Sequence, residues 1–121
     1  MAYKIGDIAH GGIIFAVDKY GEHGFVAAES DQGRKTWYEA KKICSELKLQ
    51  GYEDWILPSM RELFQMYNAL HIYGHGDFTS DWYWSSQESD YIGPWAHNFR
   101  TGDRYRVHPI EHNYIRAVRA F

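Results

Sequence analysis

Two helix-start signals lie in the middle of this chain, between stretches that have the patterns of β-strands. Thr36-Trp37-Tyr38-Glu39 and Ser59-Met60-Arg61-Glu62 are both capping boxes, in which a hydroxyl and a carboxylate satisfy free backbone amides at the start of a helix. A strand pair is expected before them and several short strands after them. This order of elements predicts an α+β fold.

The predicted elements follow from short patterns. Residues 5–9 and 12–17, a turn at 18–21 and a return at 24–28 predict a hairpin. A first helix from residue 36 carries apolar side chains at helical spacing up to Leu47, with Gly51 as its stop, and Cys44 is expected in the core. The second helix follows Ser59, and Gly74 and Gly76 are expected to end it.

Residues 81–88 alternate aromatic and hydroxyl side chains over the length of a strand. Tyr83, Ser85 and Gln87 should face one side, and Trp84, Ser86 and Glu88 the other, as in an inner strand. Further on, residues 95–99 predict a strand with Trp95, His97 and Phe99 on one face. A turn at 101–103, a loop-like run at 104–113 and a closing strand at 114–121 complete the chain.

Composition limits the class of protein. The 121 residues, 45% of them hydrophobic, fit one domain with its own core, spanning residues 1–121. No apolar run approaches the roughly 18 residues of a membrane span, so membrane insertion is not expected. No signal-peptide pattern follows Met1. A cell-surface, secreted or virion-associated location is favoured if the chain is part of a larger protein.

Charge is unevenly distributed along the chain. Residues 1–90 carry eight Lys and Arg against fourteen Asp and Glu, whereas residues 91–121 carry five Arg, no Lys, and two acidic residues. Arginine makes planar, multidentate and stacking contacts, where lysine is a hydrated point charge. The basic tail therefore suggests recognition of a ligand.

Five groups of residues, in their order along the chain, resemble one known family. They are Trp37-x-x-Ala40 with Cys44; Gly51-Tyr52-x-Asp54-Trp55-x-Leu57-Pro58-Ser59-x-x-Glu62-Leu63; Tyr83-Trp84-Ser85-Ser86; Trp95-x-x-x-Phe99-x-x-Gly102; and Ile115-Arg116-Ala117-Val118-Arg119. The resemblance is to the C-terminal domain family of the Legionella collagen-like adhesin, over nearly the whole chain. It implies a C-type-lectin-like fold, with two helices flanking small antiparallel sheets, paired terminal strands, and later loops that present a ligand surface. This chain departs from the family at His97, where an aliphatic residue is common.

A narrower resemblance concerns residues 91–114. Some members of this fold family resemble the variable proteins of diversity-generating retroelements, in which template adenines, mainly in asparagine codons, are replaced at random. Between Ala96 and Tyr114 there is no Lys, Gln, Met or Trp, and only Glu111 needs a different parent codon. The resemblance implies a framework at 1–90, a variable ligand-binding segment at 91–114 and a closing strand at 115–121.

The candidate ligand-binding residues are rigid aromatics, arginines and adaptable polar groups of the kind that antibody-like binding surfaces use. They are Tyr91, Ile92, His97, Arg100, Arg104, Tyr105, Arg106, His108, His112 and Tyr114. We expect a non-catalytic module that binds a protein or glycan on another surface. The alternatives are a glycan-binding adhesin domain for sulfated or acidic polysaccharides, and a structural cap that forms a homotrimer. No nucleic-acid partner is expected.

Catalysis, metal binding and cofactors are not expected. Ser85 has no His-plus-acid partner implied by the sequence. His71 and His75, or His108 and His112, have a spacing that could bind a metal on a helix, but a glycine ends the first helix and a proline interrupts the second. The calcium-dependent sugar motif of C-type lectins is absent, so any binding is expected to be calcium-independent.

Overall fold

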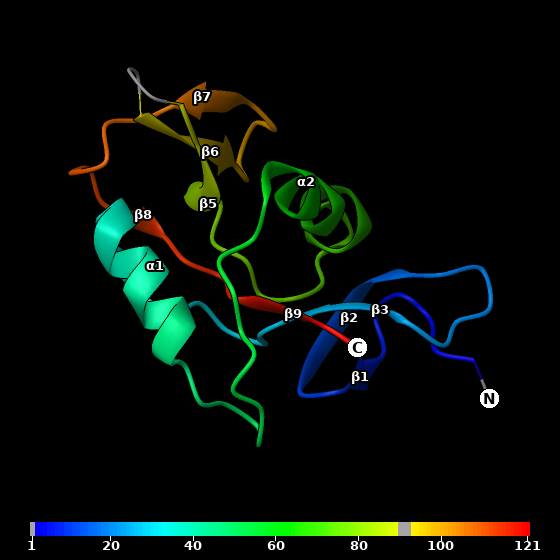
Figure 1. Ribbon diagram of the computed structural model, residues 1–121. Helices are drawn as coiled ribbons and strands as arrows, with labels where there is room; N and C mark the ends of the chain where they lie inside the picture. Colours follow the sequence, from blue (N-terminus) through cyan, green and yellow to red (C-terminus); the bar gives the residue numbers. More distant parts are fainter. Residues whose placement is uncertain (1, 90–92) are drawn as a thin grey trace.

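The chain folds into two helices and two small β-sheets, as the order of its sequence patterns predicts (Figure 1). The structure is a computed structural model that describes residues 2–89 and 93–121. Helix α1 spans Trp37–Glu46, and α2 spans Met60–Ala69. A short 3-10 helix, η1, follows at His71–Tyr73. The α+β class with two helices and two small sheets is confirmed.

The first sheet has the strand order β1-β2-β3-β9 and is antiparallel throughout. Its strands are β1 (Ile8–Ala9), β2 (Gly12–Val17), β3 (Gly24–Ala27) and β9 (Val118–Ala120). The predicted hairpin is β2 and β3. The two terminal strands therefore lie in one sheet, with β2 and β3 between them. A register shift between Ile14 and Ala16 marks a β-bulge in β2.

The second sheet has the order β4-β8-β5-β6-β7. Its strands are β4 (Arg34–Lys35), β8 (Asn113–Tyr114), β5 (Trp82–Ser89), β6 (Gly93–Asn98) and β7 (Arg104–Arg106). The inner strand predicted at 81–88 is confirmed as β5. Two expectations were wrong: residues 104–113 contain a strand, and residues 114–121 belong to two strands in different sheets. Strands of two or three residues are too short for period-two alternation to be recognised.

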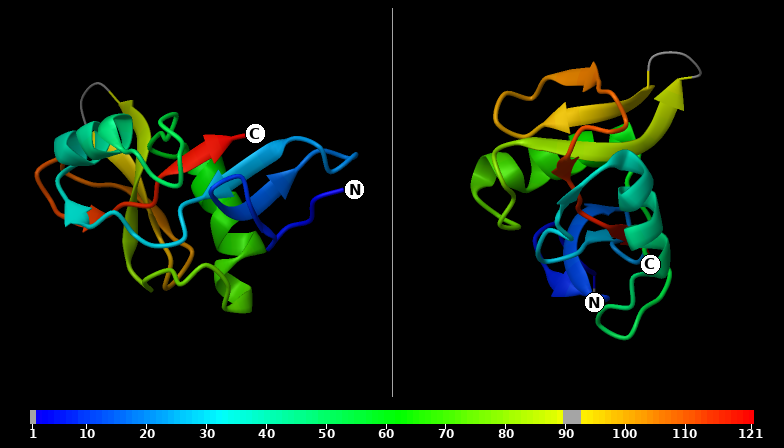
Figure 2. Two further views of the ribbon diagram at one scale, coloured as in Figure 1. Left: turned by 90° about the horizontal axis from the view of Figure 1, so that it is seen from below. Right: turned by 90° about the vertical axis from the view of Figure 1, so that its left-hand side faces the viewer.

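Alternation along β5 explains how the two helices cover this sheet. Tyr83 packs in a cluster with Leu63 and Met66 of α2, whereas Trp84 packs with Ala40 and other buried side chains of α1. Because neighbouring strand residues point to opposite faces, α1 and α2 lie on opposite faces of the sheet. The two views in Figure 2 show the helices on either side of β5.

Both predicted capping boxes are present. The amide of Glu39 donates to Thr36 Oγ1 at 3.3 Å, and the Thr36 amide donates to Glu39 Oε1 at 3.3 Å. At α2, the Glu62 amide donates to Ser59 Oγ at 3.2 Å, and the Ser59 amide donates to Glu62 Oε1 at 2.9 Å. These bonds satisfy amides that the first turn of a helix leaves free.

Both helices end earlier than the glycines predicted. In α1 the cap residue Leu47 is already extended, and Gly51 lies instead in a turn outside the helix, with a φ of 81°. In α2 the helix ends at Ala69, and Gly74 ends η1 in the left-handed region. Cys44 is buried in the core, as predicted, and burial raises the pKa of its thiol to about 12.

Replacing Ser59 by alanine should lower the free energy of unfolding by about 1 kcal/mol, because the Glu62 amide loses its acceptor. Thermal or urea unfolding measures the change. Ser59→Thr is the matched control, since it keeps the hydroxyl and should remain close to the parent protein. A Ser59→Ala variant as stable as the parent would show that the cap does not stabilise this helix.

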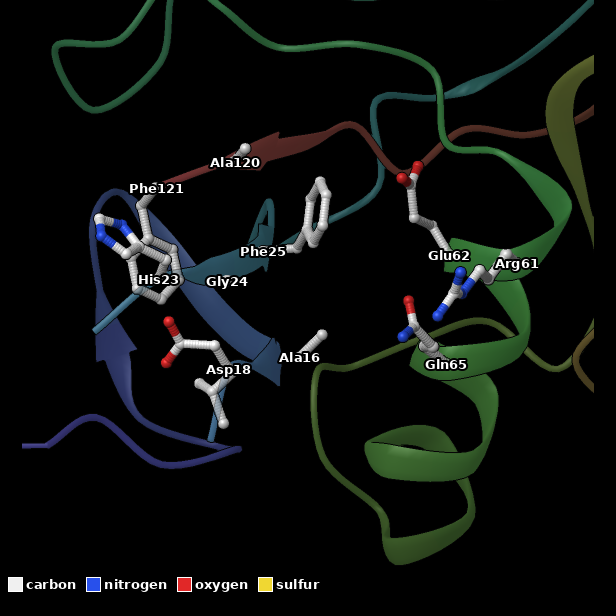
Figure 3. A pocket seen from close by; sticks show the side chains of 11 residues that line it. Ala16, Asp18, His23, Gly24, Phe25, Arg61, Glu62, Gln65, Ala120 and Phe121 are labelled. Carbon is white, nitrogen blue, oxygen red and sulfur yellow. The ribbon is translucent and has the colours of Figure 1, made fainter. Parts of the chain in front are cut away.

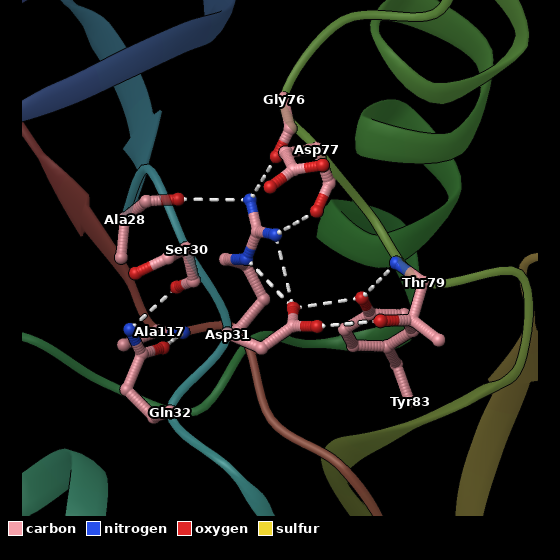
Figure 4. Close-up of polar contacts among 10 residues, drawn as sticks. Ala28, Ser30, Asp31, Gln32, Gly76, Asp77, Thr79, Tyr83 and Ala117 are labelled. Carbon is pink, nitrogen blue, oxygen red and sulfur yellow. Dashed lines mark hydrogen bonds and ion pairs between the residues drawn. The ribbon is translucent and has the colours of Figure 1, made fainter.

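Arg116 is a fully buried ion-pair partner that joins three segments of the chain (Figure 4). Its Nε donates to Asp31 Oδ1 at 3.0 Å, and its other nitrogens donate to the carbonyls of Ala28, Gly76 and Asp77 at 2.7–3.0 Å. Asp31 also accepts from the hydroxyl groups of two further residues, Tyr83 at 2.7 Å and Thr79 at 2.9 Å.

Arg119 is also largely buried. It forms an ion pair with Asp54 at 2.6 Å and stacks 3.6 Å from the ring centroid of Tyr52. Together with Arg116 it accounts for two of the five tail arginines, so the basic character of the tail comes partly from residues that hold the fold. No helix among the described residues is long and apolar enough to cross a membrane.

Candidate functional site

The predicted ligand-binding residues that the structure describes lie mainly around β6 and β7. Figures 1 and 2 show these strands at one end of the molecule and the chain termini at the other. β7 is an edge strand, paired only with β6, and its register places Arg106 opposite Trp95 and Arg104 opposite His97. The side chains of Arg104, Tyr105 and Arg106 are all exposed.

These three side chains do not share one face of the sheet, although the sequence suggested a single ligand surface for them. Arg106 lies over the ring of Trp95, 4.8 Å from its centroid, and Arg104 lies 5.8 Å from the ring centroid of Phe64 on α2. Tyr105 contacts Trp82, at 5.8 Å between ring centroids, on the opposite face of the sheet. Because β7 is extended, successive side chains alternate between the two faces.

Arg104 lines an open groove between α2 and the sheet, and Arg106 lies over the ring of Trp95, another residue of its lining. The groove has a volume of about 490 Å³ and is lined by Met60, Gln87, Trp95 and Arg104. We call it the arginine groove. Gln87 Oε1 accepts a hydrogen bond from the amide of Met60 at 2.8 Å, which ties the start of α2 to β5. The groove thus has an aromatic wall, a guanidinium and an amide side chain fixed at its edges.

The guanidinium groups at this groove have no acidic partner within residues 2–89 and 93–121. The salt bridges there involve Lys48, Arg116 and Arg119, and not Arg104 or Arg106. Both groove arginines contact aromatic rings instead. A guanidinium stacked on an aromatic ring keeps its N–H donors in its own plane, parallel to the ring, where acceptors such as carboxylate or sulfate groups can reach them.

His97 is buried below this surface, so its assignment as a ligand-binding residue was wrong. Its side chain is 0% exposed and packs between Tyr67 and Phe99, with ring centroids 5.2 and 5.3 Å away. Burial, together with the positive charge of Arg104, lowers its pKa to about 4. Neither ring nitrogen has a hydrogen-bond partner among the described residues. Its position on the inward face of β6 explains the burial.

The loop between β7 and β8 lies beside the start of α1. The amide of Trp37 donates to the carbonyl of Pro109 at 3.0 Å, which fixes the loop against the helix. His108 and His112 are exposed there, and His108 Nδ1 accepts from the amide of Ile110 at 3.3 Å. These two histidines therefore lie on an irregular loop, at the side of the sheet that faces α1.

The remaining predicted residues fall in different surroundings. Arg100 is exposed in the turn after β6, where its amide donates to Asn98 Oδ1 at 2.8 Å. Tyr114 is half-buried in β8 and contacts Tyr83 of the core, at 5.8 Å between ring centroids. Tyr91 and Ile92 lie outside the described residues.

The comparisons with known proteins gave one decisive match. The family model of the Lcl C-terminal domain matches residues 18–119, which include both helices, the whole second sheet, and β3 with most of β9 from the first sheet. The chain belongs to the Lcl C-terminal domain family. Membership supports an adhesin-like module. A search of curated proteins gave no match.

Sequence reasoning missed two residues of the arginine groove in this Lcl domain, Trp95 and Gln87, and also Phe64, the ring that Arg104 contacts. Trp95 was expected on one face with His97 and Phe99, yet those two side chains are buried and Trp95 is partly exposed. Phe64 is 49% exposed on α2 and was not singled out. It lies off the buried stripe that contains Leu63 and Met66, and a large aromatic outside such a stripe is a usable signal. Gln87 offered no signal of this kind.

The sequence also raised metal-binding histidines and a nucleophilic serine in this Lcl domain. Within residues 2–89 and 93–121, no three His, Cys, Asp or Glu side chains lie where they could hold one metal ion. Ser85, which the sequence raised as a nucleophile, is buried, and its hydroxyl donates to the carbonyl of Trp95 at 2.6 Å. That bond uses its proton to join β5 and β6.

The depressed pKa of His97 predicts a specific loss of stability in acid. The folded protein keeps this imidazole neutral, whereas the unfolded chain protonates it below about pH 6.5. The contribution of the neutral His97 imidazole to the free energy of unfolding is therefore present above pH 6.5 and is lost as the pH falls toward 4. Between pH 7.5 and 4.5, the free energy of unfolding should fall by about 2 to 3 kcal/mol more in the parent than in His97→Leu. Urea unfolding at a series of pH values measures the difference, and parallel pH profiles would contradict it.

Proposed function

We propose that this Lcl domain is a non-catalytic binding module that recognises an acidic macromolecular ligand through the arginine groove. The observation that carries the proposal is the pair of exposed guanidinium groups, Arg104 and Arg106, held against aromatic rings without acidic partners in the described chain. Charge-assisted hydrogen bonds to carboxylate or sulfate groups are about twice as strong as neutral ones.

The groove also suits a polymer better than a small molecule. It is open at the surface, and β7 beside it is an edge strand whose outer backbone groups face away from the sheet. Exposed Arg100 lies in the turn that precedes β7, so positive charge extends along the strand beyond the groove itself. An extended acidic chain could meet successive arginines along this line, and its affinity would fall steeply with salt.

Heparin is a suitable probe for this proposal, because it presents sulfate and carboxylate groups on one chain. Arg104→Gln and Arg106→Gln should each weaken binding about tenfold at low salt, since each removes a charge-assisted contact. Arg34→Gln is the matched control, because Arg34 is exposed on β4, away from the groove. Calorimetry at several salt concentrations measures the effect.

The outcomes of this experiment separate the alternatives. If polyglutamate displaces bound heparin, carboxylates suffice for binding. If polyglutamate does not displace it, sulfate is required. No binding at low salt, or equal losses in Arg34→Gln and Arg104→Gln, would contradict the proposal. A stable trimer in sedimentation that Tyr105→Ser dissociates would favour the structural cap, since Tyr105 is 59% exposed in the single chain.

Diversification of residues 91–114 is a second candidate property, favoured by their restricted amino-acid types. Six of the predicted positions in this segment are exposed: Arg100, Arg104, Tyr105, Arg106, His108 and His112. Substitutions there would change the surface and leave the core intact. An asparagine-rich near-copy of the codons for residues 91–119, next to a reverse transcriptase gene, would establish it. A gene neighbourhood without such a copy would contradict the diversification hypothesis.

A further inference from the structure

Strand β7 is the edge of the second sheet, and its hydrogen bonds to β6 fix which of its backbone groups point outward (Figures 1 and 2). The amide of Val107 donates to the carbonyl of Pro94 at 2.9 Å, and the amide of Asn98 donates to the carbonyl of Asp103 at 2.8 Å. Hydrogen-bonded and non-hydrogen-bonded pairs alternate along an antiparallel ladder. Tyr105, midway between Asp103 and Val107, therefore directs its backbone groups toward β6.

The backbone groups of Arg104 and Arg106 point the other way, to the outer edge of the sheet. Each residue presents one N–H donor and one C=O acceptor there, because the register pairs both residues with β6 at non-hydrogen-bonded positions. These four groups have no hydrogen-bond partner within residues 2–89 and 93–121. An edge with such a row of unpaired groups is a template for one more strand.

The side chains of β7 define what such a strand would carry. Arg104 and Arg106 are two residues apart and lie on the face of the sheet that holds the arginine groove. Tyr105 lies on the opposite face, in contact with Trp82. A strand beside β7 would place every second side chain next to a guanidinium and the side chain between them next to Tyr105. Acidic residues at alternate positions, with an apolar residue between them, match this edge.

Positive charge predominates along β7. Residues 100–106 carry three arginines and one acidic residue, Asp103, whose Oδ2 accepts from the hydroxyl of Thr101 at 2.8 Å. Glu88 lies on β5, with β6 between it and β7. Neither carboxylate forms a salt bridge in the described chain. A second copy of β7 would place arginines against arginines, so the edge favours an acidic partner over self-association.

Two other surfaces suit an acidic strand less well. Strand β4 is the opposite edge of the sheet, but the carbonyl of Lys35 already accepts from Trp84 Nε1 at 2.8 Å. A pocket of about 530 Å³ lies where the β2–β3 hairpin meets α2 (Figure 3). It has carboxylates on both sides, from Asp18 and from Glu62 beside Arg61, and these repel an acidic chain.

We propose that β7 accepts an extended acidic peptide as an additional antiparallel strand of the second sheet. This inference rests on the proposed function, since it uses the same arginines, and it names the ligand as a polypeptide. A peptide backbone supplies both N–H and C=O groups, so it can satisfy all four outward groups of Arg104 and Arg106. The sulfate and carboxylate groups of an acidic polysaccharide only accept hydrogen bonds, so they can satisfy only the two donors.

The test uses the blocked peptide acetyl-Thr-Glu-Val-Glu-Thr-amide at low salt, with binding to the whole chain followed by amide chemical shifts. In the antiparallel register, its two glutamates lie opposite the two arginines and direct their N–H groups to β7, whereas the valine N–H points away. N-methylation of both glutamates should therefore weaken binding at least about tenfold. N-methylation of the valine is the matched control and should change binding by less than about twofold.

Three further measurements locate the peptide. The amides of Arg104 and Arg106 should shift on binding, whereas those of Gly24 and Gln65, in the pocket of Figure 3, should not. The peptide acetyl-Thr-Glu-Glu-Val-Thr-amide has the same composition but places its carboxylates on opposite faces, so it should bind more weakly. Heparin should displace the first peptide, because both ligands need Arg104 and Arg106.

The outcomes separate this inference from the proposed function. Equal binding of all the methylated and unmethylated peptides, with a loss in Arg104→Gln, would overturn strand addition and leave recognition of charge intact. A loss on valine methylation alone would overturn the antiparallel register. Binding of heparin but not of millimolar peptide would overturn the polypeptide as the ligand. If neither heparin nor the peptide binds, the proposed function itself fails.

Discussion

Replacing Arg116 by methionine should lower the free energy of unfolding by about 3–5 kcal/mol. Methionine fills much of the space but donates no hydrogen bonds. The carbonyls of Ala28, Gly76 and Asp77 would lose their donor, and Asp31 would lose its ion-pair partner in a largely buried position. Urea unfolding followed by tryptophan fluorescence measures the change.

Two further variants make this result specific. Arg100→Met is the matched control, because Arg100 is exposed, and it should stay within about 0.5 kcal/mol of the parent. Arg116→Lys should still cost a large part of the stability, since one ammonium group cannot reach acceptors arranged around a planar fork. If Arg116→Met is as stable as Arg100→Met, the buried network does not hold these segments together.

Trp84→Ala should lower the free energy of unfolding by about 3–5 kcal/mol, because it leaves a large cavity between β5 and α1. The ring is 0% exposed and packs against Trp37, Ala40 and other core residues. Its Nε1 also donates to the carbonyl of Lys35 at 2.8 Å, which ties β5 to β4. Chemical or thermal unfolding gives the loss directly.

The contrast with exposed residues of the proposed variable segment is the informative part of this experiment. Arg104→Ser and His108→Asn should each remain within about 0.5 kcal/mol of the parent, because both side chains are exposed. A framework that tolerates such changes is what a diversified binding surface needs. If either substitution unfolds the domain as readily as Trp84→Ala, residues 91–114 belong to the core, and the diversification hypothesis fails.

Within that segment, His97 and Tyr114 set a limit on useful diversity. His97 is buried and Tyr114 is half-buried against Tyr83, so polar or bulky replacements there would act on stability before they changed the surface. Arg104 and Arg106, by contrast, can vary at little structural cost. The proposed binding surface is therefore narrower than the segment that the amino-acid types outline.

The candidate site was predictable in its composition but not in its geometry. Exposed arginine and tyrosine in a late, lysine-free stretch pointed to Arg104, Tyr105 and Arg106, and all three are exposed. The sequence could not show that residues 104–106 form an edge strand. Without a predicted strand there, the division of their side chains between two faces of the sheet could not be predicted either. Trp95 lines the groove with a partly exposed ring, over which the guanidinium of Arg106 lies.

The amino-acid sequence by itself determined the features that depend on local interactions. Both helix starts follow from side chains three residues apart, and the inner strand β5 follows from its own alternation. Tertiary structure alone decided where short strands pair, that Arg116 is buried with Asp31, and which side chains meet at each pocket. These contacts join residues as far apart as Asp31 and Arg116, and they form only when packing brings distant segments together. A local sequence pattern predicts the conformation of its own residues, whereas a pocket depends on which distant segments pack next to each other.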